Sequence, residues 1–508
     1  MLPTDQEVNW LVCSPLSDQT VYGKFNSFLF RTLAERGQKV VAYLAEEELR
    51  QCDNHFDARF VSNEIFCSEL ELENYVRGNR NAKIISHVDR FLNDSFLVKT
   101  YLRISDRMMV VPQSAGTRFV LLRLTIEFWA ILINEFKINS IWFPATPHFG
   151  FDTVLALMAE KLSINVFIVN RTEYDGVYIV SNRIFPRSYL ERTSALKLNL
   201  KPKWIEYSRK LSADAVMHNQ RIDKSTSYKF RSAINLTRLM IRLISVMISN
   251  KNWFRRYSPL YMTSYRAFVF LPSIIFRYSQ SRRLWISYKN ASCDQIPNPY
   301  IYFPWSFQPE RTTDPEAGKF SDLEFCVHYL MAELPREFTL VIKEHPRQFD
   351  TAAVDLRKMH ARHSQLYKRI SQIERVVIAD INLDSERLVR ESAACVTTTG
   401  SIGVEVLEMG KSIGCFGTPW YAGLNGCYRI DTKRNLKIFF KCIQSKSNKV
   451  LTTELAVRMQ QYLSNHFFQM PNKSTILESF TCEEIKQMAE QLASAVQKKK
   501  YSSLTEKF

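Results

Sequence analysis

Two parts of the chain alternate short apolar runs with amphipathic segments. In the first part, residues 9–14 and 39–44 are apolar runs that predict strands. Residues 23–37 lie between them, have helical spacing and close on a glycine, as a helix does. Residues 140–169 repeat the order strand, loop, helix, strand. This alternation predicts a parallel sheet with helices on both faces.

The alternation lapses near residue 201 and restarts near residue 298. The second part predicts strands at 300–304, 338–346, 375–380, 394–400 and 412–417, with helices at 320–334, 385–392 and 401–410. We therefore predict an α/β protein with two doubly wound, Rossmann-like domains that face each other across a cleft. The expected organisation is an N-terminal Rossmann-like domain (1–200), a basic aromatic-rich helical segment (201–290), a second Rossmann-like domain (291–450), and C-terminal helices with a basic tail (451–508).

The composition is that of a globular protein. The 508 residues are 46% hydrophobic and 23% charged, which suits two or three domains with their own cores. The ten cysteines form no CxxC pair, so neither a disulfide scaffold nor a zinc site is predicted, and a reducing cytosol is favoured. Residues 118–138 are apolar but interrupted by charges, which favours a buried or amphipathic helix over a membrane span. The first residues lack the pattern of a secretion signal, so a cytoplasmic protein is expected.

The positive charge is concentrated in one segment. The formal net charge is +17, and residues 201–290 hold 18 Lys and Arg against 3 Asp and Glu, a net +15. Such a block predicts an anionic partner: a phospholipid surface, a lipid-linked phosphate or nucleic acid. No known nucleic-acid-binding module is recognisable, so nucleic acid is not the predicted partner.

One predicted strand ends in "KEHP", which places Lys343, Glu344, His345 and Pro346 at its carboxyl end. Ligands of open parallel sheets bind beyond the carboxyl ends of the strands, where His345 can donate to a phosphate oxygen. Side chains alternate across a strand, so only one of Lys343 and Glu344 is expected on the face of His345. The alternative is a solvent-exposed turn without a ligand.

A second strand ends in "TTTGS". Gly400 permits a close turn after Thr398 and Thr399, and a helix begins at Ser401. Ser401 or Thr399 can cap this helix, and its first N–H groups favour an anion. Glu405 lies one turn further on the same face, where it can accept from a ribose or sugar hydroxyl. The alternative is an ordinary turn in which the hydroxyls only cap. No GxGxxG or P-loop lysine is present, which excludes the usual dinucleotide and NTPase sites.

The segment "FPWSFQPERTT" places Gln308, Glu310 and Arg311 after the first strand of the second part. A carboxylate there can act as nucleophile or base, and an arginine can pair with a phosphate. The alternative is a surface turn with an ion pair. Trp420 and Tyr421 follow a later strand, where they can stack on a base or sugar or belong to the core.

In the N-terminal part, "FPATPHFGFDTVLAL" puts His148 at a strand end and Asp152 at the start of the next helix. Either side chain can take the proton of an acceptor. Asp152 can instead serve only as an acidic residue favoured in a first helical turn.

Four segments together resemble the bacterial capsule polysaccharide biosynthesis family, which includes the Kdo transferases of capsule assembly. They are "YFPWSFQPERTTDPEAGKF", "LPREFTLVIKEHP", "TTTGSIGVEVLEMGKS" and "FGTPWY", in this order within residues 298–425. The resemblance implies a GT-B-like fold with the nucleotide-sugar donor in the C-terminal domain and the acceptor in the N-terminal domain. It implies that His345 and Pro346 contact the nucleotide phosphate, and that Thr399, Gly400, Ser401 and Glu405 hold the nucleotide.

The same resemblance implies a catalytic or sugar-positioning role for Glu310 and a metal-independent reaction without a cofactor. CMP-Kdo is the first donor to consider. The acceptor is a glycan or a lipid-linked glycan at the inner face of the cytoplasmic membrane, and residues 201–290 would dock there, beside other capsule-assembly proteins. Two alternatives stay open: a polyol-phosphate transferase with a CDP-linked donor, and a catalytically inactive glycan-binding subunit of a capsule assembly complex.

Overall fold

The described residues form two compact units, each built around its own sheet. The computed structural model describes residues 7–14, 21–45, 56–67, 69–105, 114–172, 177–184, 279, 282–308, 310–349, 362–363, 365–445, 467–469 and 482–502. Unit 1 takes its residues from Met1–Leu102, Ser114–Ala213 and Gln461–Phe508; unit 2 takes them from Arg103–Gln113 and Asp214–Gln460.

The sheet of unit 1 has seven strands in the order β14-β6-β5-β4-β1-β2-β3. Its strands are β1 (Val8–Val12), β2 (Gln38–Ala45), β3 (Arg59–Ser62), β4 (Ser140–Phe143), β5 (Asn165–Arg171), β6 (Val177–Ser181) and β14 (Phe467–Gln469). The first five in sequence are parallel, and β6 and β14 add an antiparallel edge. The order places β1 and β4 side by side at the point where the winding reverses.

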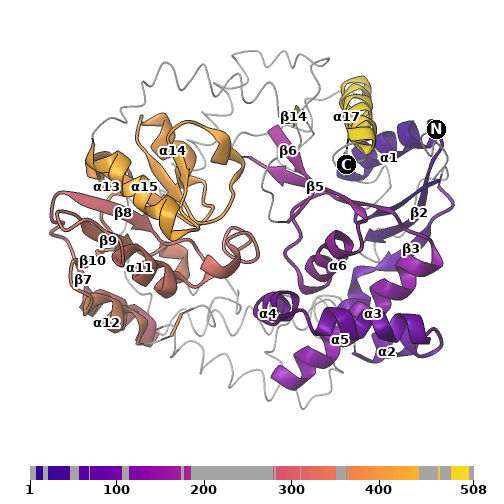
Figure 1. Ribbon diagram of the computed structural model, residues 1–508, viewed down its shortest axis with the longest axis horizontal. Helices are drawn as coiled ribbons and strands as arrows, with labels where there is room; N and C mark the ends of the chain where they lie inside the picture. Colours follow the sequence, from indigo (N-terminus) through magenta and orange to yellow (C-terminus); the bar gives the residue numbers. More distant parts are fainter. Residues whose placement is uncertain are drawn as a thin grey trace, which may run out of the picture. The chain divides into compact units, whose positions relative to one another are not determined.

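Apolar residues at helical spacing cover this sheet. The helices are α1 (Val21–Ala34), α2 (Glu69–Arg77), α3 (Ala82–Leu92), α4 (Ser95–Ile104), α5 (Ala115–Glu135), α6 (Gly150–Lys161) and α17 (Cys482–Ser502). The interior of α5 is buried from Leu121 to Leu132 except at Arg123, as predicted for this apolar segment. The C-terminal helix α17 lies against α1, at the other end of the sequence, and shares its core (Figure 1).

The sheet of unit 2 is wholly parallel, in the order β13-β12-β11-β8-β9-β10-β7. Its strands are β7 (Ser292–Cys293), β8 (Tyr300–Pro304), β9 (Thr339–Lys343), β10 (Val376–Ala379), β11 (Ala394–Thr397), β12 (Ile413–Cys415) and β13 (Cys427–Arg429). Every residue of β11 and β12 is buried, because helices cover both faces of the sheet. The helices are α11 (Leu323–Met331), α12 (Leu366–Ser371), α13 (Ser385–Glu391), α14 (Ile402–Glu408) and α15 (Lys433–Gln444).

The two doubly wound sheets confirm the predicted fold class, α/β with two Rossmann-like domains. The cleft between the domains stays a prediction. The basic segment 201–290 lies outside the described residues except for residues 279 and 282–290, so its helical character and membrane contact also stay predictions.

Candidate functional site

The winding of the unit 2 sheet reverses between β8 and β11. From β8 the chain runs outward through β9 and β10, and it then returns to β11 on the other side of β8. The loops after β8 and β11 therefore diverge at their carboxyl ends, which is where open α/β sheets bind ligands. A contact of 3.2 Å between the hydroxyl oxygens of Ser306 and Thr398 joins the two loops. We call this place the unit 2 switch point.

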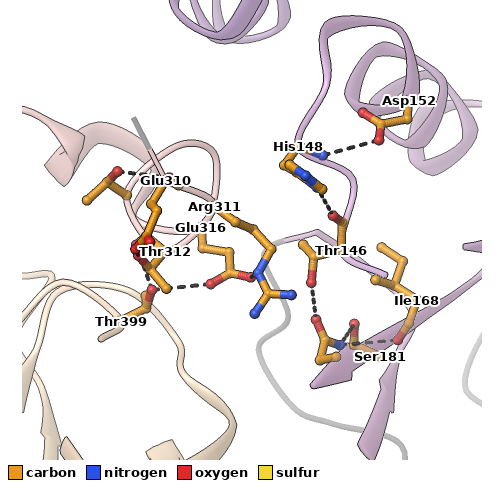
Figure 2. Close-up of polar contacts among 12 residues, drawn as sticks. Thr146, His148, Asp152, Ile168, Ser181, Glu310, Arg311, Thr312, Glu316 and Thr399 are labelled. Carbon is orange, nitrogen blue, oxygen red and sulfur yellow. Dashed lines mark hydrogen bonds and ion pairs between the residues drawn. The ribbon is translucent and has the colours of Figure 1, made fainter. Parts of the chain in front are cut away.

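Arg311 is held at the unit 2 switch point by a carboxylate that the sequence did not single out. Its Nε atom lies 2.9 Å from Oε1 of Glu316 (Figure 2). Glu316 in turn lies 3.3 Å from the Thr399 hydroxyl, which donates its proton to the Thr312 carbonyl at 2.6 Å. Within the described part of the chain, only the Nε edge of Arg311 is paired, so its two terminal NH₂ groups are available to an anion.

Glu310 lies directly before this arginine and is exposed. Its carboxylate accepts a long hydrogen bond of 3.4 Å from the Thr312 hydroxyl, and its carbonyl accepts the N–H groups of Thr313 and Asp314 (Figure 2). The backbone of Glu310 is thus fixed by a turn, while its carboxylate stays open to solvent. This arrangement allows contact with a substrate.

The "TTTGS" turn keeps its predicted position but not its predicted capping. Ser401 makes no side-chain capping bond, so that prediction is wrong; instead the Thr397 hydroxyl accepts the N–H of Gly400 at 3.1 Å. Ser401 and Glu405 are both exposed on α14. Desolvation, followed by the charges of Glu408 and Glu386, raises the pKa of Glu405, although solvent at its exposed surface limits this shift.

Trp420 and Tyr421 lie in the core. Trp420 is 5% exposed and Tyr421 is fully buried. The Tyr421 hydroxyl donates to the Gly400 carbonyl at 2.5 Å, and its ring occupies the space where a Cβ on Gly403 would lie, 2.2 Å away. Of the two roles predicted for Tyr421, the structure therefore supports packing behind the "TTTGS" turn.

The three ionisable residues at the end of β9 point to different partners. The Lys343 amine donates to the Leu383 carbonyl and to the Ser385 hydroxyl, at 2.5 and 2.9 Å, and fixes the start of α13. The Glu344 side chain is completely buried against Arg362. His345 is partly exposed, and its ring lies 5.9 Å from that of Phe307 in the loop after β8. The strand ends at Lys343, three residues earlier than predicted, and Pro346 starts a short 3₁₀ turn, η5 (Pro346–Gln348).

Gln308 is buried, and its polar groups are used within the protein. Its side-chain amide donates to the Ser321 carbonyl at 2.7 Å, and its backbone N–H and C=O both bond the side chain of Gln348. These bonds fasten the loop after β8 to the turn after β9. Gln308 is therefore placed to shape the site, beneath the residues that a donor would contact.

In unit 1, the winding of the sheet reverses between β1 and β4, as it does between β8 and β11 in unit 2. Asp152 occupies the first turn of α6, and its carboxylate accepts the backbone N–H of His148 at 3.3 Å (Figure 2). Desolvation raises the pKa of Asp152 to about 7, against the smaller lowering effect of the surrounding N–H donors. The Cys13 thiol, directly after β1, lies near enough for the Asp152 charge to help raise its pKa, after desolvation. We call this place the unit 1 switch point.

His148 is held in this loop by its own ring. Its Nδ1 lies 2.8 Å from the Thr146 carbonyl, and because a carbonyl only accepts, Nδ1 carries a proton and donates it (Figure 2). The Thr146 hydroxyl donates to Asn170 at 2.5 Å, which ties the loop to β5. His148 and Asp152, both predicted for acceptor chemistry, are thus adjacent.

Sequence reasoning missed four residues that build these places: Ser306, Glu316, Arg362 and Cys13. Each has a contact with a residue distant in sequence: the Ser306 contact spans 92 residues, and Glu316, which pairs with the nearby Arg311, also contacts Thr399, 83 residues away. No local pattern marks such residues. Among the described residues, no group of three or more His, Cys, Asp or Glu side chains is arranged to hold a metal ion.

Residues 315–461 match the family described as "Capsule polysaccharide biosynthesis protein". This segment contains the "EHP", "TTTGS" and "FGTPWY" motifs, and its match to that family agrees with the resemblance. It covers less than a third of the chain, and the loop with Glu310 and Arg311 precedes it.

Several solved structures are similar to the chain at low identity. The UDP-GlcNAc 2-epimerase of Methanocaldococcus jannaschii is 11% identical, covers 89% of this chain and 99% of its own, and has a TM-score of 0.23. The beta Kdo 2,7 transferase KpsC of Thermosulfurimonas dismutans is 11% identical over 71% of this chain and 88% of its own, with a TM-score of 0.26. The UDP-GlcNAc 2-epimerase of Neisseria meningitidis is 10% identical over 90% of this chain and 100% of its own, with a TM-score of 0.21.

No curated protein sequence matches the chain. Within the described ranges, none of the helices has the length and apolar character needed to cross a membrane.

Proposed function

We propose that this protein is a glycosyltransferase of capsule or surface polysaccharide biosynthesis. Unit 2 would bind a nucleotide-sugar donor and unit 1 would activate the acceptor. The observation that carries the proposal is the unit 2 switch point, where Arg311, the threonine hydroxyls and the nearby His345 meet at the carboxyl edge of a sheet. Most of this edge lies in the segment that matches the capsule polysaccharide biosynthesis family.

The donor phosphate would lie over the ends of β8, β9 and β11. The terminal NH₂ groups of Arg311 can bind an anion bidentately, while His345 and Ser401 supply further donors. Glu405, one turn along α14, would accept from a ribose or sugar hydroxyl. Glu310 would contact the sugar itself, because its carboxylate is exposed next to Arg311.

Transfer breaks the bond between the anomeric carbon and the phosphate oxygen, and the nucleotide leaves with the electron pair. The acceptor hydroxyl forms the new bond to the same carbon and loses its proton. Asp152 is our candidate for taking this proton, because a base works best when its pKa lies near the working pH, and its pKa is about 7. His148 would orient the acceptor beside it.

CMP-Kdo is the proposed donor, and no cofactor or metal is proposed to be needed. The acceptor would be a glycan or lipid-linked glycan at the inner face of the cytoplasmic membrane, with residues 201–290 docking on anionic lipid. Other capsule-assembly proteins would be partners there. No role with nucleic acid is proposed.

A thermal-shift screen against CMP, CDP, UDP, GDP and inorganic phosphate tests the donor assignment. We expect a shift with CMP that is lost in His345→Ala, and then transfer from CMP-Kdo. A response to CDP alone would instead favour the polyol-phosphate transferase. Silence with every nucleotide would contradict the proposal and favour the inactive glycan-binding subunit.

A further inference from the structure

A buried ion pair lies directly behind His345. The side chains of Glu344 and Arg362 are 0% and 1% exposed, and they meet through two bonds, Nε to Oε2 at 2.7 Å and Nη2 to Oε1 at 3.2 Å. The Tyr367 hydroxyl also donates to Glu344, at 2.6 Å. Desolvation works to lower the pKa of Arg362, but the charge and hydrogen bonds of Glu344, together with those of Tyr367, raise that pKa above its ordinary value.

Arg362 extends this pair into the loop after β8. Its Nη1 donates to the Gln308 side chain and its Nη2 to the Ser306 carbonyl at 3.2 Å, while the guanidinium lies 5.1 Å from the centre of the Trp305 ring. Gln308 also exchanges two hydrogen bonds with Gln348, in η5. One guanidinium therefore joins three residues of the loop after β8 to the end of β9.

Glu344 connects the ion pair to the backbone of His345. Its Oε1 accepts the backbone N–H of His345 at 2.9 Å, which fixes the direction in which the chain leaves β9. His345 then meets Phe307, in the loop that Arg362 holds. Both loops that would contact the donor are thus oriented by the same pair of buried charges.

We propose that Arg362 and Glu344 are positioning residues that set the loops after β8 and β9 for donor binding, an inference that rests on the proposed function. Replacing a buried ion pair with apolar side chains is often neutral or stabilising, so stability alone does not explain such a pair. The planar guanidinium of Arg362 donates to acceptors in both loops at once, which the amine of a lysine cannot reproduce.

The test compares Arg362→Lys with Arg375→Lys. Arg375 is an arginine of the same domain that donates to three carbonyls, those of Leu334, Pro335 and Phe338, but at the amino ends of β9 and β10, away from the site. Two quantities are measured in the full chain: hydrogen exchange of the backbone amides of residues 343–349, and affinity for CMP.

In Arg362→Lys we expect exchange across 343–349 to accelerate at least about 10-fold and CMP affinity to fall about 10-fold. Arg375→Lys is expected to lower the melting temperature with both quantities unchanged. If the two variants lose melting temperature alike and neither changes exchange or affinity, the pair is only structural and the inference is wrong.

Tyr367→Phe covers the case in which Arg362→Lys does not fold. It removes one hydrogen bond to Glu344 and leaves the ion pair in place, so we expect exchange across 343–349 to rise about 2- to 3-fold with a fall of similar size in affinity. Unchanged exchange in that variant overturns the inference. If the wild-type protein binds no nucleotide, the proposed function fails, while the exchange measurement still decides whether the pair positions His345.

Discussion

The two switch points occupy equivalent positions in two similar sheets, yet their chemistry differs. In unit 1 the order β3-β2-β1-β4-β5 brings the ends of β1 and β4 together; in unit 2 the order β10-β9-β8-β11-β12 does the same for β8 and β11. Unit 1 places there a carboxylate whose pKa is raised to about 7. Unit 2 places there an arginine, a histidine nearby and several hydroxyls. The winding determines where a site forms, and the side chains at the strand ends determine whether it handles protons or anions.

The largest effect is expected from Asp152→Asn, at the unit 1 switch point. The amide oxygen can still accept the N–H of His148, but the side chain can no longer take a proton. We expect kcat for transfer to fall about 100- to 1,000-fold, the range typical of a lost general base. The assay is initial-rate transfer from CMP-Kdo at saturating donor.

The affinity of the same variant for CMP serves as the control and should stay unchanged, because nucleotide binding is assigned to unit 2. A kcat within about 5-fold of wild type would remove Asp152 from the chemistry. It would leave this aspartate as an acidic residue of a first helical turn.

His345→Ala is the matching change in unit 2. A hydrogen bond to a charged group contributes about 1.5–3 kcal/mol, so CMP affinity should fall at least about 10-fold. Calorimetric titration with CMP measures it. His328→Ala, at an exposed position of α11 in the same unit, is the matched control and should bind normally. Normal binding by His345→Ala would show that the imidazole does not contact the phosphate.

A pH series tests the raised pKa of Asp152, which distinguishes the unit 1 switch point from the unit 2 switch point. The pKa of Asp152 is near 7 in the folded protein, above its ordinary value of 3.8, so the folded state holds a proton between these pH values that the unfolded chain has lost. The wild type therefore loses stability as pH rises towards 7, and Asp152→Asn does not.

At pH 8 we expect Asp152→Asn to be more stable than wild type by about 1–2 kcal/mol, after solvent reduces the effect at this partly exposed side chain. The difference should shrink steadily towards pH 5, where the wild-type carboxyl becomes protonated. Chemical denaturation at both pH values measures it. In wild type, kcat should rise with pH up to about 7 and then level off. A variant that is less stable than wild type at pH 8 would contradict the raised pKa.

A feature of this fold or site can be predicted from the sequence when the residues that form it lie close together along the chain. The alternation of apolar runs and amphipathic segments is local, so β1, α1 and β2 were predicted within a few residues, as was the parallel sheet of unit 2. Strand ends are local too, which is why His345 and the "TTTGS" turn were found.

Contacts between distant segments have no local sequence pattern that predicts them. The strand β14 has three residues and pairs with β6, nearly 300 positions earlier, and α17 lies on α1 at the other end of the chain. Arg362 acquires its role, and Glu316 its contact with Thr399, only when folding brings other loops to them. Lys343, Trp420 and Tyr421 show the converse: their types and positions suggested ligand contact, but the structure uses them to anchor α13 and to fill the core.

The smallest effect on CMP affinity is expected from a change at Glu316, in unit 2. Glu316→Gln keeps the size of the side chain but removes the charge that holds the Nε edge of Arg311. Arg311 and Glu316 are both partly exposed, so the pair contributes only about 0.5–1 kcal/mol, and CMP affinity should fall about 2- to 5-fold. The apparent pKa of the rate near 7 should not move, because Asp152 belongs to the other unit. If that pKa shifts while CMP affinity stays constant, Glu316 takes part in the proton chemistry, and the division between an anion-binding unit and a proton-handling unit is wrong.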